Sequence, residues 1–213
     1  MKVLSVNIGD KRTVQWGNKT VETGIFKFPT ESIQLGLEDV VGDSVVNRIY
    51  HGGVDKACYL YAADHYDYWR EKYPNTVSEY GAMGENITIE GLDERKLNVG
   101  DTFQLGEAIV QISEHREPCY KLNIRLNEHS GIKDFIALGH CGTYCRVLKQ
   151  GEVKPGDEML LIEKGTSASI FDIFSLIYKK SEDRTLLESI LKDPLITDGT
   201  KEELSRVWGL SEK

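Results

Sequence analysis

Long apolar runs are missing from this sequence. The N-terminal segment MKVLSVNIGDK is apolar for only a few residues before charges appear, which is too short for the core of a signal peptide. No later stretch approaches the ~20 apolar residues that a membrane-spanning helix needs. We therefore expect a cytoplasmic protein without a membrane partner.

Cysteines are also scarce, with four in 213 residues. They are irregularly spaced (Cys58, Cys119, Cys141 and Cys145), which predicts free thiols instead of a disulfide framework. Cys141 and Cys145 follow His140, but no second ligand pair lies at zinc-site spacing. Core packing is the favoured interpretation for these two residues, and Cys58 lies in an apolar run that predicts burial.

An excess of basic residues is absent as well. The formal net charge of −8 argues against nucleic acid as a partner, because such binding needs a basic face. The same acidic background makes any local cluster of Arg, Lys and His more informative. GxGxxG, P-loop, HExxH and GxSxG motifs are missing, and so is the cysteine spacing of iron–sulfur clusters.

Short β-like segments dominate residues 1 to about 163. They are rich in β-branched and aromatic residues and are punctuated by Gly, Asp and Asn, which predicts a mainly β fold with peripheral helices. Turn residues predict two hairpins, one at Leu105–Glu107 and one within CRVLKQGEVKPGDEMLLI. The expected strands are VLSVNIG, TVETGIFKF, SVVNRIY, KACYLYA, ENITIEG and DTFQLGEAIVQI.

Two helices are expected between these strands, over residues 62–73 and 129–140. Gly139 is a plausible C-cap of the second. Within or beside them, His65 and His129 have no partner in the sequence and are interpreted as ordinary surface residues. The first helix carries a stripe at helical spacing that we interpret as core packing: Tyr66, Trp69 and Tyr73.

The composition changes after residue 163. Three amphipathic helical patterns follow, ASIFDIFSLIYKK, EDRTLLESILK and TKEELSRVWGL. Thr200 and Glu203 have the spacing of a capping box before the third. We expect a β-rich domain over residues 1–165 and a small three-helix domain over residues 166–213.

The first candidate for chemistry is the segment REPCYKL, residues 116–122. Pro118 suits the first position of a helix, which would place Cys119 in the first turn, where a thiolate is stabilised. Arg116 adds a positive charge nearby. Such a thiolate is a soft-metal ligand or a nucleophile. The alternative is a small, half-buried packing residue.

The second candidate is the segment RIYHGGVDK, residues 48–56. A strand is expected to end in a His-Gly-Gly turn whose glycines allow a ligand to approach the backbone. Arg48, His51 and Lys56 bring three potential cations together in an acidic protein, which suits an anion such as a phosphate. The alternative is a solvated turn with incidental charges.

The third candidate is GAMGEN, residues 81–86. Glu85 and Asn86 begin a strand after two glycines, where they could hydrogen-bond the edge of a heterocycle. They could equally cap a turn.

Taken together, these segments resemble one family. The runs HGGVDKACYLYAADHYDYW, GENITIEGL, VGDTFQLGEAIVQISEHREPCYKL and GTYCRVLKQGEVKPGDEM are similar to the molybdenum cofactor sulfurase C-terminal (MOSC) domain family, over roughly residues 1–163. The helical tail resembles the three-helix extension of one bacterial stand-alone subgroup. The resemblance implies a barrel-like β fold that binds molybdenum cofactor (molybdopterin); pyridoxal phosphate binding is not expected.

The resemblance also implies roles for individual residues. Cys119 would be the metal ligand and the catalytic residue. The phosphate and the pterin would be held by Arg116 and by residues of the other two segments and their surroundings. The cofactor-binding residues expected on this basis are Arg48, His51, Lys56 and Arg116 for the phosphate, and Glu85, Asn86 and Thr30 for the pterin; Tyr144 and Arg146 could be structural.

The implied activity is reduction of N-hydroxylated compounds, such as base analogues or amidoximes, in detoxification. Electrons would come from a separate donor protein, and a homodimer is possible. One alternative is a non-catalytic carrier of molybdenum cofactor or sulfur, with a persulfide on Cys119 and the helical tail as docking surface. Another is a cysteine-nucleophile transferase or hydrolase that pairs Cys119 with His51 or His115.

Overall fold

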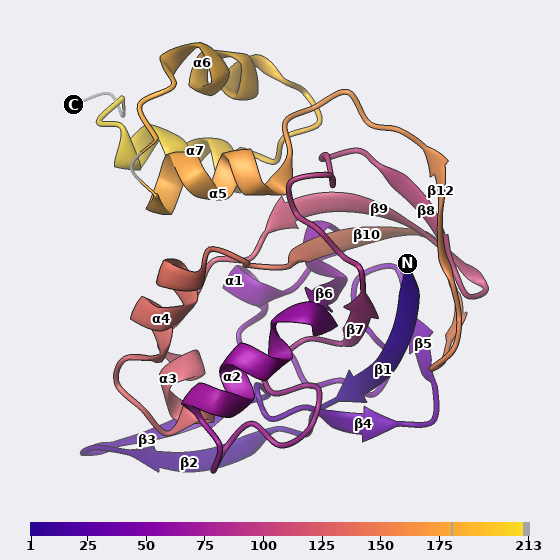
Figure 1. Cartoon of the computed structure of the whole chain (residues 1–213), viewed down its shortest axis with the longest axis vertical. Helices are drawn as coiled ribbons and strands as arrows, with labels where there is room; N and C mark the ends of the chain where they lie inside the picture. The colour runs from indigo at the N-terminus through magenta and orange to yellow at the C-terminus, as the bar shows by residue number, and fades with distance from the viewer. Residues whose placement is uncertain (180, 211–213) are drawn as a thin grey trace.

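Eight of the strands form one curved sheet in the computed structural model, which describes residues 1–179 and 181–210 (Figure 1). The strand order is β12-β8-β9-β10-β6-β7-β1-β4, and only the β6–β7 pair is parallel. The strands are β1 (Lys2–Ile8), β4 (Phe28–Thr30), β6 (Cys58–Ala62), β7 (Ile87–Glu90), β8 (Thr102–Leu105), β9 (Ala108–His115), β10 (Thr143–Lys149) and β12 (Met159–Glu163).

Two short ribbons complete the β structure. One joins β2 (Arg12–Trp16) to β3 (Lys19–Thr23), and the other joins β5 (Ile33–Leu35) to β11 (Gly151–Val153). Within the sheet, β10 connects the half that contains β9 to the half that contains β6.

Short helices lie around the sheet in Figure 1. They are α1 (Arg48–His51), η1 (Val54–Lys56), η2 (Ala63–His65), α2 (Tyr66–Lys72), α3 (Lys121–Leu126) and α4 (Gly131–Leu138). Gly139 caps α4 in the left-handed conformation, as predicted. No helix of the described residues has the length and apolar character to cross a membrane.

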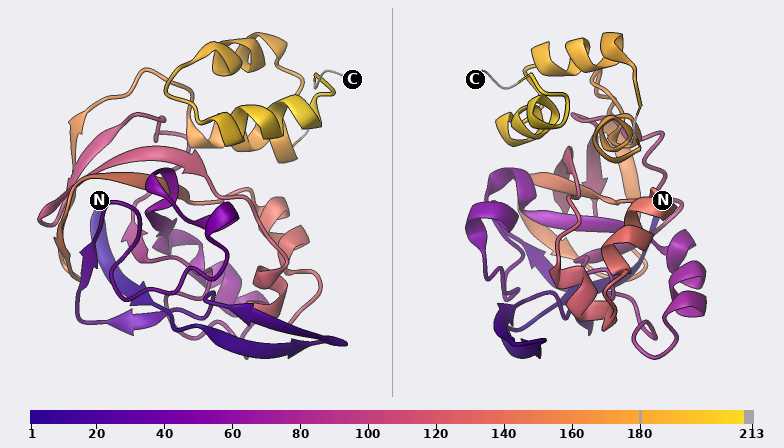
Figure 2. Two further views of the ribbon diagram at one scale, coloured as in Figure 1. Left: turned by 180° about the vertical axis from the view of Figure 1, so that it is seen from behind. Right: turned by 90° about the vertical axis from the view of Figure 1, so that its left-hand side faces the viewer.

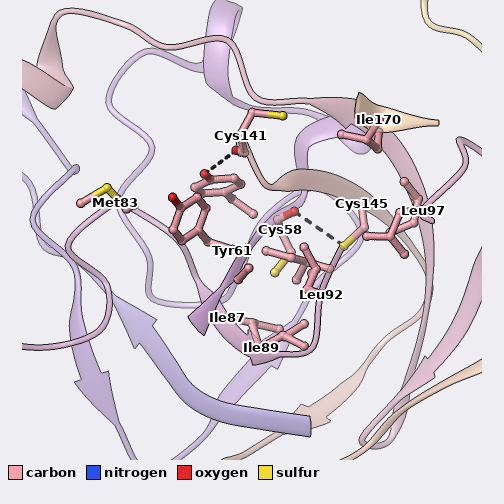
Figure 3. Close-up of a cluster of buried hydrophobic side chains, with 14 of the residues drawn as sticks. Cys58, Tyr61, Met83, Ile87, Ile89, Leu92, Leu97, Cys141, Cys145 and Ile170 are labelled. Atoms are coloured by element: carbon pink, nitrogen blue, oxygen red, sulfur yellow. Dashed lines mark hydrogen bonds between the residues drawn. The ribbon is translucent and has the colours of Figure 1, made fainter. Parts of the chain in front are cut away.

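The core lies where the central strand β6 is covered on both faces. All five of its residues are buried, and Tyr66, Trp69 and Tyr73 pack against the same core from α2 and its C-terminal end. The predicted packing stripe is therefore confirmed. Cys58, Cys141 and Cys145 are buried free thiols among Ile, Leu and Met side chains, also as predicted; Figure 3 shows them together.

The three C-terminal helices are α5 (Ile170–Tyr178), α6 (Arg184–Lys192) and α7 (Asp198–Val207). Figure 2 shows them gathered at one end of the molecule. α5 packs on β9, and the apolar faces of all three helices belong to the same hydrophobic cluster as the sheet. Two parts of the predicted C-terminal domain lie outside the described residues. They are residue 180, within the first predicted helix, and residues 211–213 at the end of the domain.

TVETGIFKF is not one strand, because β3 ends at Thr23 and β4 begins at Phe28. Three other local predictions outside the cavity were wrong. SVVNRIY forms no strand; it is loop followed by α1, in which Ile49 is 89% exposed. Its β-branched residues have no neighbouring strand to pair with, and β propensity depends on such packing. Residues 145–162 form no hairpin, because β10 pairs with β9 and β6 whereas β12 pairs with β8.

The predicted capping box of α7 is the third. Thr197, not Thr200, is the N-cap, and its side chain accepts a hydrogen bond from the Thr200 backbone N–H. Glu203 instead accepts a hydrogen bond from Tyr178 of α5 at 2.8 Å. Its carboxylate therefore joins two helices instead of capping one.

Candidate functional site

A cavity opens between the loops before β6 and the segment that joins β9 to α3. Its walls combine four Lys and Arg side chains, one histidine, one thiol and two tyrosines. The lining side chains with polar atoms include Lys27, Asp43, His51, Lys56, Tyr59, Asn86, Arg116, Cys119, Lys121 and Tyr144. In an acidic protein this concentration of cations is specific to the cavity and favours an anionic ligand.

Cys119 lies in irregular backbone between β9 and α3 and is half-buried. The prediction that Pro118 begins a helix was wrong, because α3 begins at Lys121. The Cys119 carbonyl accepts a hydrogen bond from Leu122 N–H at 2.9 Å, so the segment enters the helix through a turn. The thiol lines both the inner cavity and its wider outer part.

Arg116 is a fixed, buried cation in the wall of the cavity. Its side chain is 5% exposed, donates a hydrogen bond to the Met83 carbonyl, and lies 4.7 Å from the Tyr59 ring centroid and 5.5 Å from that of Phe135. Burial lowers the pKa of Arg116, but the neighbouring Tyr59, Tyr144 and Cys119 raise it by more, so the guanidinium is charged. Within residues 1–179 and 181–210 it forms no salt bridge with a carboxylate.

The field inside the cavity is positive. Burial, followed by the charges of Arg116, Lys121 and Lys56, lowers the pKa of His51 to about 4, so its imidazole is neutral near pH 7. The Lys56 ammonium lies 3.3 Å from a Glu114 carboxylate oxygen and 3.2 Å from the Tyr50 carbonyl.

A polar network forms another part of the wall. Lys27 forms an ion pair with Asp43, whose Oδ2 also accepts a hydrogen bond from Asn86 Nδ2 at 3.0 Å. The Asn86 Oδ1 accepts from Tyr59 N–H at 3.2 Å. This network fixes the loop before β6 to the strand β7.

The structure brings together five of the eight site residues expected from the sequence. They are His51, Lys56, Asn86, Arg116 and Cys119, all of which line the cavity. Their roles toward a cofactor remain predictions.

The other three lie elsewhere. Arg48 is exposed on α1 and pairs with Asp39 and Glu38. Thr30 lies on β4 beside Val6 of β1. Glu85 is fully buried and accepts hydrogen bonds from Gly81 and Met83 N–H, which folds the GAMGEN loop. This geometry gives no support to a contact between these three residues and a ligand.

Sequence reasoning missed several wall residues. Lys121 follows Cys119 by two positions, so the REPCYKL segment contained the signal for it. Tyr144 was interpreted as structural although it lines the cavity. Lys27 and Asp43 come from loops with no local motif, and only the fold brings them to Asn86.

The outer part of the cavity is bordered by the β2–β3 ribbon, α1 and α7. Glu202, Glu203 and Arg206 of α7 line it together with Cys119. The C-terminal helices therefore contribute to the entrance.

The position of α7 is fixed from the sheet side. The His115 Nε2 lies 3.3 Å from a Glu203 carboxylate oxygen. His115 is 2% exposed, packs against Phe174 and Tyr178 of α5, and does not line the cavity, so the structure gives no support to its pairing with the Cys119 thiol.

Comparisons with known proteins agree with this architecture. YflK of Bacillus subtilis (strain 168) is 36% identical over 198 residues, covering 92% of this chain and 89% of YflK. A protein named Reductase from Gibberella moniliformis (strain M3125 / FGSC 7600) is 33% identical over 161 residues, which are 72% of this chain but 29% of that protein. The crystal structure of YiiM from Geobacillus stearothermophilus superposes with a TM-score of 0.78 at 30% identity, covering 97% of this chain and 98% of that one.

The family model described as MOSC domain matches residues 47–160, which contain α1, β6, β7, the β8–β9 hairpin, Cys119 and β10. The mainly β fold with peripheral helices and three C-terminal helices is the one expected from the resemblance in sequence. This chain belongs to the MOSC domain family.

Proposed function

We propose that the chain binds molybdenum cofactor in this cavity and uses it to reduce N-hydroxylated compounds. The observation that carries the proposal is that Arg116 and Cys119 line the same cavity. Arg116 is a buried cation without a carboxylate partner in the described residues, and Cys119 offers a half-buried thiol. A buried charge needs a partner. An anionic ligand that also carries a soft metal satisfies both side chains.

The residues present fit the two ends of such a cofactor. Arg116, Lys56 and Lys121 supply charge-assisted hydrogen-bond donors for a phosphate. The thiolate of Cys119 suits a metal that already has sulfur ligands. The Asn86 amide, held by Asp43 and Tyr59, offers polar atoms on the same wall.

When bound, the cofactor supplies two-electron redox chemistry. Reduction of an N-hydroxyl group breaks the N–O bond, consumes two electrons and two protons, and releases water and the amine. Since the sequence contains no motif for a dinucleotide or an iron–sulfur cluster, the electrons come from a separate donor protein. The name of the Gibberella relative supports a reductase activity.

The chain's own residues position the reactants. The rigid contacts of Arg116 with Met83, Tyr59 and Phe135 fix the charge that orients the phosphate. The outer part of the cavity, between α1, the β2–β3 ribbon and α7, gives the substrate its route to Cys119. Lys121 and Lys56 line both parts, so these two cations lie along the route from the entrance to the inner cavity.

The first test measures molybdenum and pterin in protein expressed in a cofactor-producing host. We expect near-stoichiometric molybdenum in the wild type and a large loss in Cys119→Ala and in Arg116→Gln. Arg48→Gln is the matched control, because this arginine is exposed and bound to Asp39 outside the cavity. Equal, negligible molybdenum in all four proteins, under conditions that load a known molybdoenzyme, would refute the cofactor assignment.

A second measurement separates catalysis from transport. Loaded protein is given an N-hydroxylated substrate and a chemical reductant, and formation of the amine is followed. Cofactor binding without turnover would reject the reductase and favour a carrier. A Cys119→Ser variant that keeps full cofactor-dependent turnover would reject the role of the thiolate.

A further inference from the structure

Three metal-ligating side chains meet away from the cavity. His65 ends η2, Glu94 follows β7, and His140 lies between α4 and β10. One ligand atom from each lies within 4.8 Å of the other two. None of the three lines the cavity around Cys119. His65, interpreted from the sequence as an ordinary surface residue, is half-buried and stacks on His140.

Glu94 carries a buried negative charge. Its side chain is 1% exposed, and its two oxygens accept hydrogen bonds from Gly142 N–H at 2.8 Å and from His140 Nδ1 at 3.0 Å. Among the described residues no Lys or Arg forms a salt bridge with it. A buried carboxylate is stable when a cation or a metal ion compensates it.

The two imidazoles lie face to face beside Glu94. Their ring centroids are 3.7 Å apart and their planes are inclined by 25°.

We propose that His65, Glu94 and His140 form a binding site for a divalent transition-metal ion of the zinc type. Two imidazoles and one carboxylate are a recognised three-ligand set for such an ion, with water completing the coordination. Ligands of a tetrahedral ion at about 2.0–2.1 Å lie about 3.3 Å apart, and an imidazole binds the ion in its ring plane. Closing the site therefore requires the half-buried imidazoles to rotate out of their stacked arrangement. A bound ion ties η2, the loop after β7 and the loop before β10 together.

The test is a titration of purified, chelator-treated protein with Co²⁺, followed by absorption and by calorimetry. A Cys119→Ser background removes the one thiol that is not buried. We expect one equivalent of Co²⁺ with d–d bands and without a thiolate-to-cobalt charge-transfer band. His65→Ala and His140→Ala should each weaken Co²⁺ binding by at least about 100-fold. Loss of a residue that only supports a ligand typically weakens metal binding by about 10–100-fold, so a loss of this size indicates a direct ligand.

His129→Ala is the matched control, because His129 is exposed and is not part of the cluster. The Tm of the Cys119→Ser protein should rise with Zn²⁺ concentration, while that of the same protein with His65→Ala should not. Absence of stoichiometric binding to the Cys119→Ser protein, or equal affinity in the two histidine variants and the control, would overturn the site. Since the background lacks Cys119, the result is independent of the molybdenum measurement.

Discussion

Replacing Glu85 tests whether the GEN motif is part of the ligand site or a structural element. The carboxylate is fully buried and accepts four hydrogen bonds. The donors are the backbone N–H groups of Gly81 and Met83 at 2.8 and 3.1 Å, the Thr88 hydroxyl at 2.8 Å, and the Tyr66 hydroxyl. Glu85→Ala leaves all four without this acceptor and opens a void.

The expected loss is large. Each buried donor without a partner costs about 1–3 kcal/mol, and such losses are not additive within one network. We therefore expect Glu85→Ala to lower the free energy of unfolding by roughly 3–5 kcal/mol, as is typical when one partner of a buried charged network is removed. Glu85→Gln keeps the shape but turns an N–H₂ group toward existing donors, so a smaller loss of about 1–3 kcal/mol is expected.

Urea unfolding followed by circular dichroism measures the effect. With a slope of about 2–3 kcal/mol per molar, the midpoint of Glu85→Ala should fall by roughly 1–2 M. Glu90→Ala removes an exposed carboxylate at the end of β7, the strand that follows Glu85, and should change stability by less than about 0.5 kcal/mol. If Glu85→Ala loses less than about 1 kcal/mol, the structural role argued from these hydrogen bonds is wrong.

Three further predictions concern the cavity, the helices and one glycine. The pKa of His51 is lowered to about 4 in the folded chain, whereas an unfolded histidine has a pKa of about 6.5. Between these pH values the unfolded chain binds a proton at His51 and the folded chain does not. Stability should fall as pH drops through this window, and His51→Asn should reduce that fall in urea titrations at about pH 7 and about pH 5. Phe174→Ala, fully buried in α5, should cost about 3–5 kcal/mol and keep a single calorimetric transition; a separate early transition would contradict the shared core. Gly142→Ala should cost about 3 kcal/mol in urea unfolding, because φ is +67° and the new Cβ would lie 2.4 Å from the Leu60 carbonyl oxygen; wild-type stability would refute that clash.

The strands were predictable where their burial produces a continuous or alternating pattern of apolar residues in the sequence. KACYLYA and AIVQISEH are continuous or alternating apolar runs, and both form strands of the sheet. SVVNRIY has the same residue types, but its valines line the cavity at Val45 and Val46 instead of pairing with a strand. Local propensity cannot distinguish these two environments, because the difference lies in what the rest of the chain places beside the segment.

The site was predictable to the extent that its residues are close in sequence. Arg116 and Cys119 belong to one segment, and His51 and Lys56 to another. Other contacts depend on the folded topology alone. Asp43 contacts Lys27 and Asn86, and Glu94 contacts His140 across 46 residues. The sequence also predicted a ligand role for Glu85, because a carboxylate that organises its own loop and one that binds a ligand look alike in a single sequence.

The central position of β10 has a consequence for synthesis of the chain. Cys58 of β6 lies beside Cys145 of β10, 87 residues later, and β9 is joined to β6 only through this strand. At a ribosomal rate of about 5–20 residues per second, the apolar edge of β6 waits roughly 4 to 17 seconds for its partner. Nascent chains stalled before residue 143 therefore leave that edge without its β10 partner, and unpaired strand edges make folding intermediates prone to aggregation.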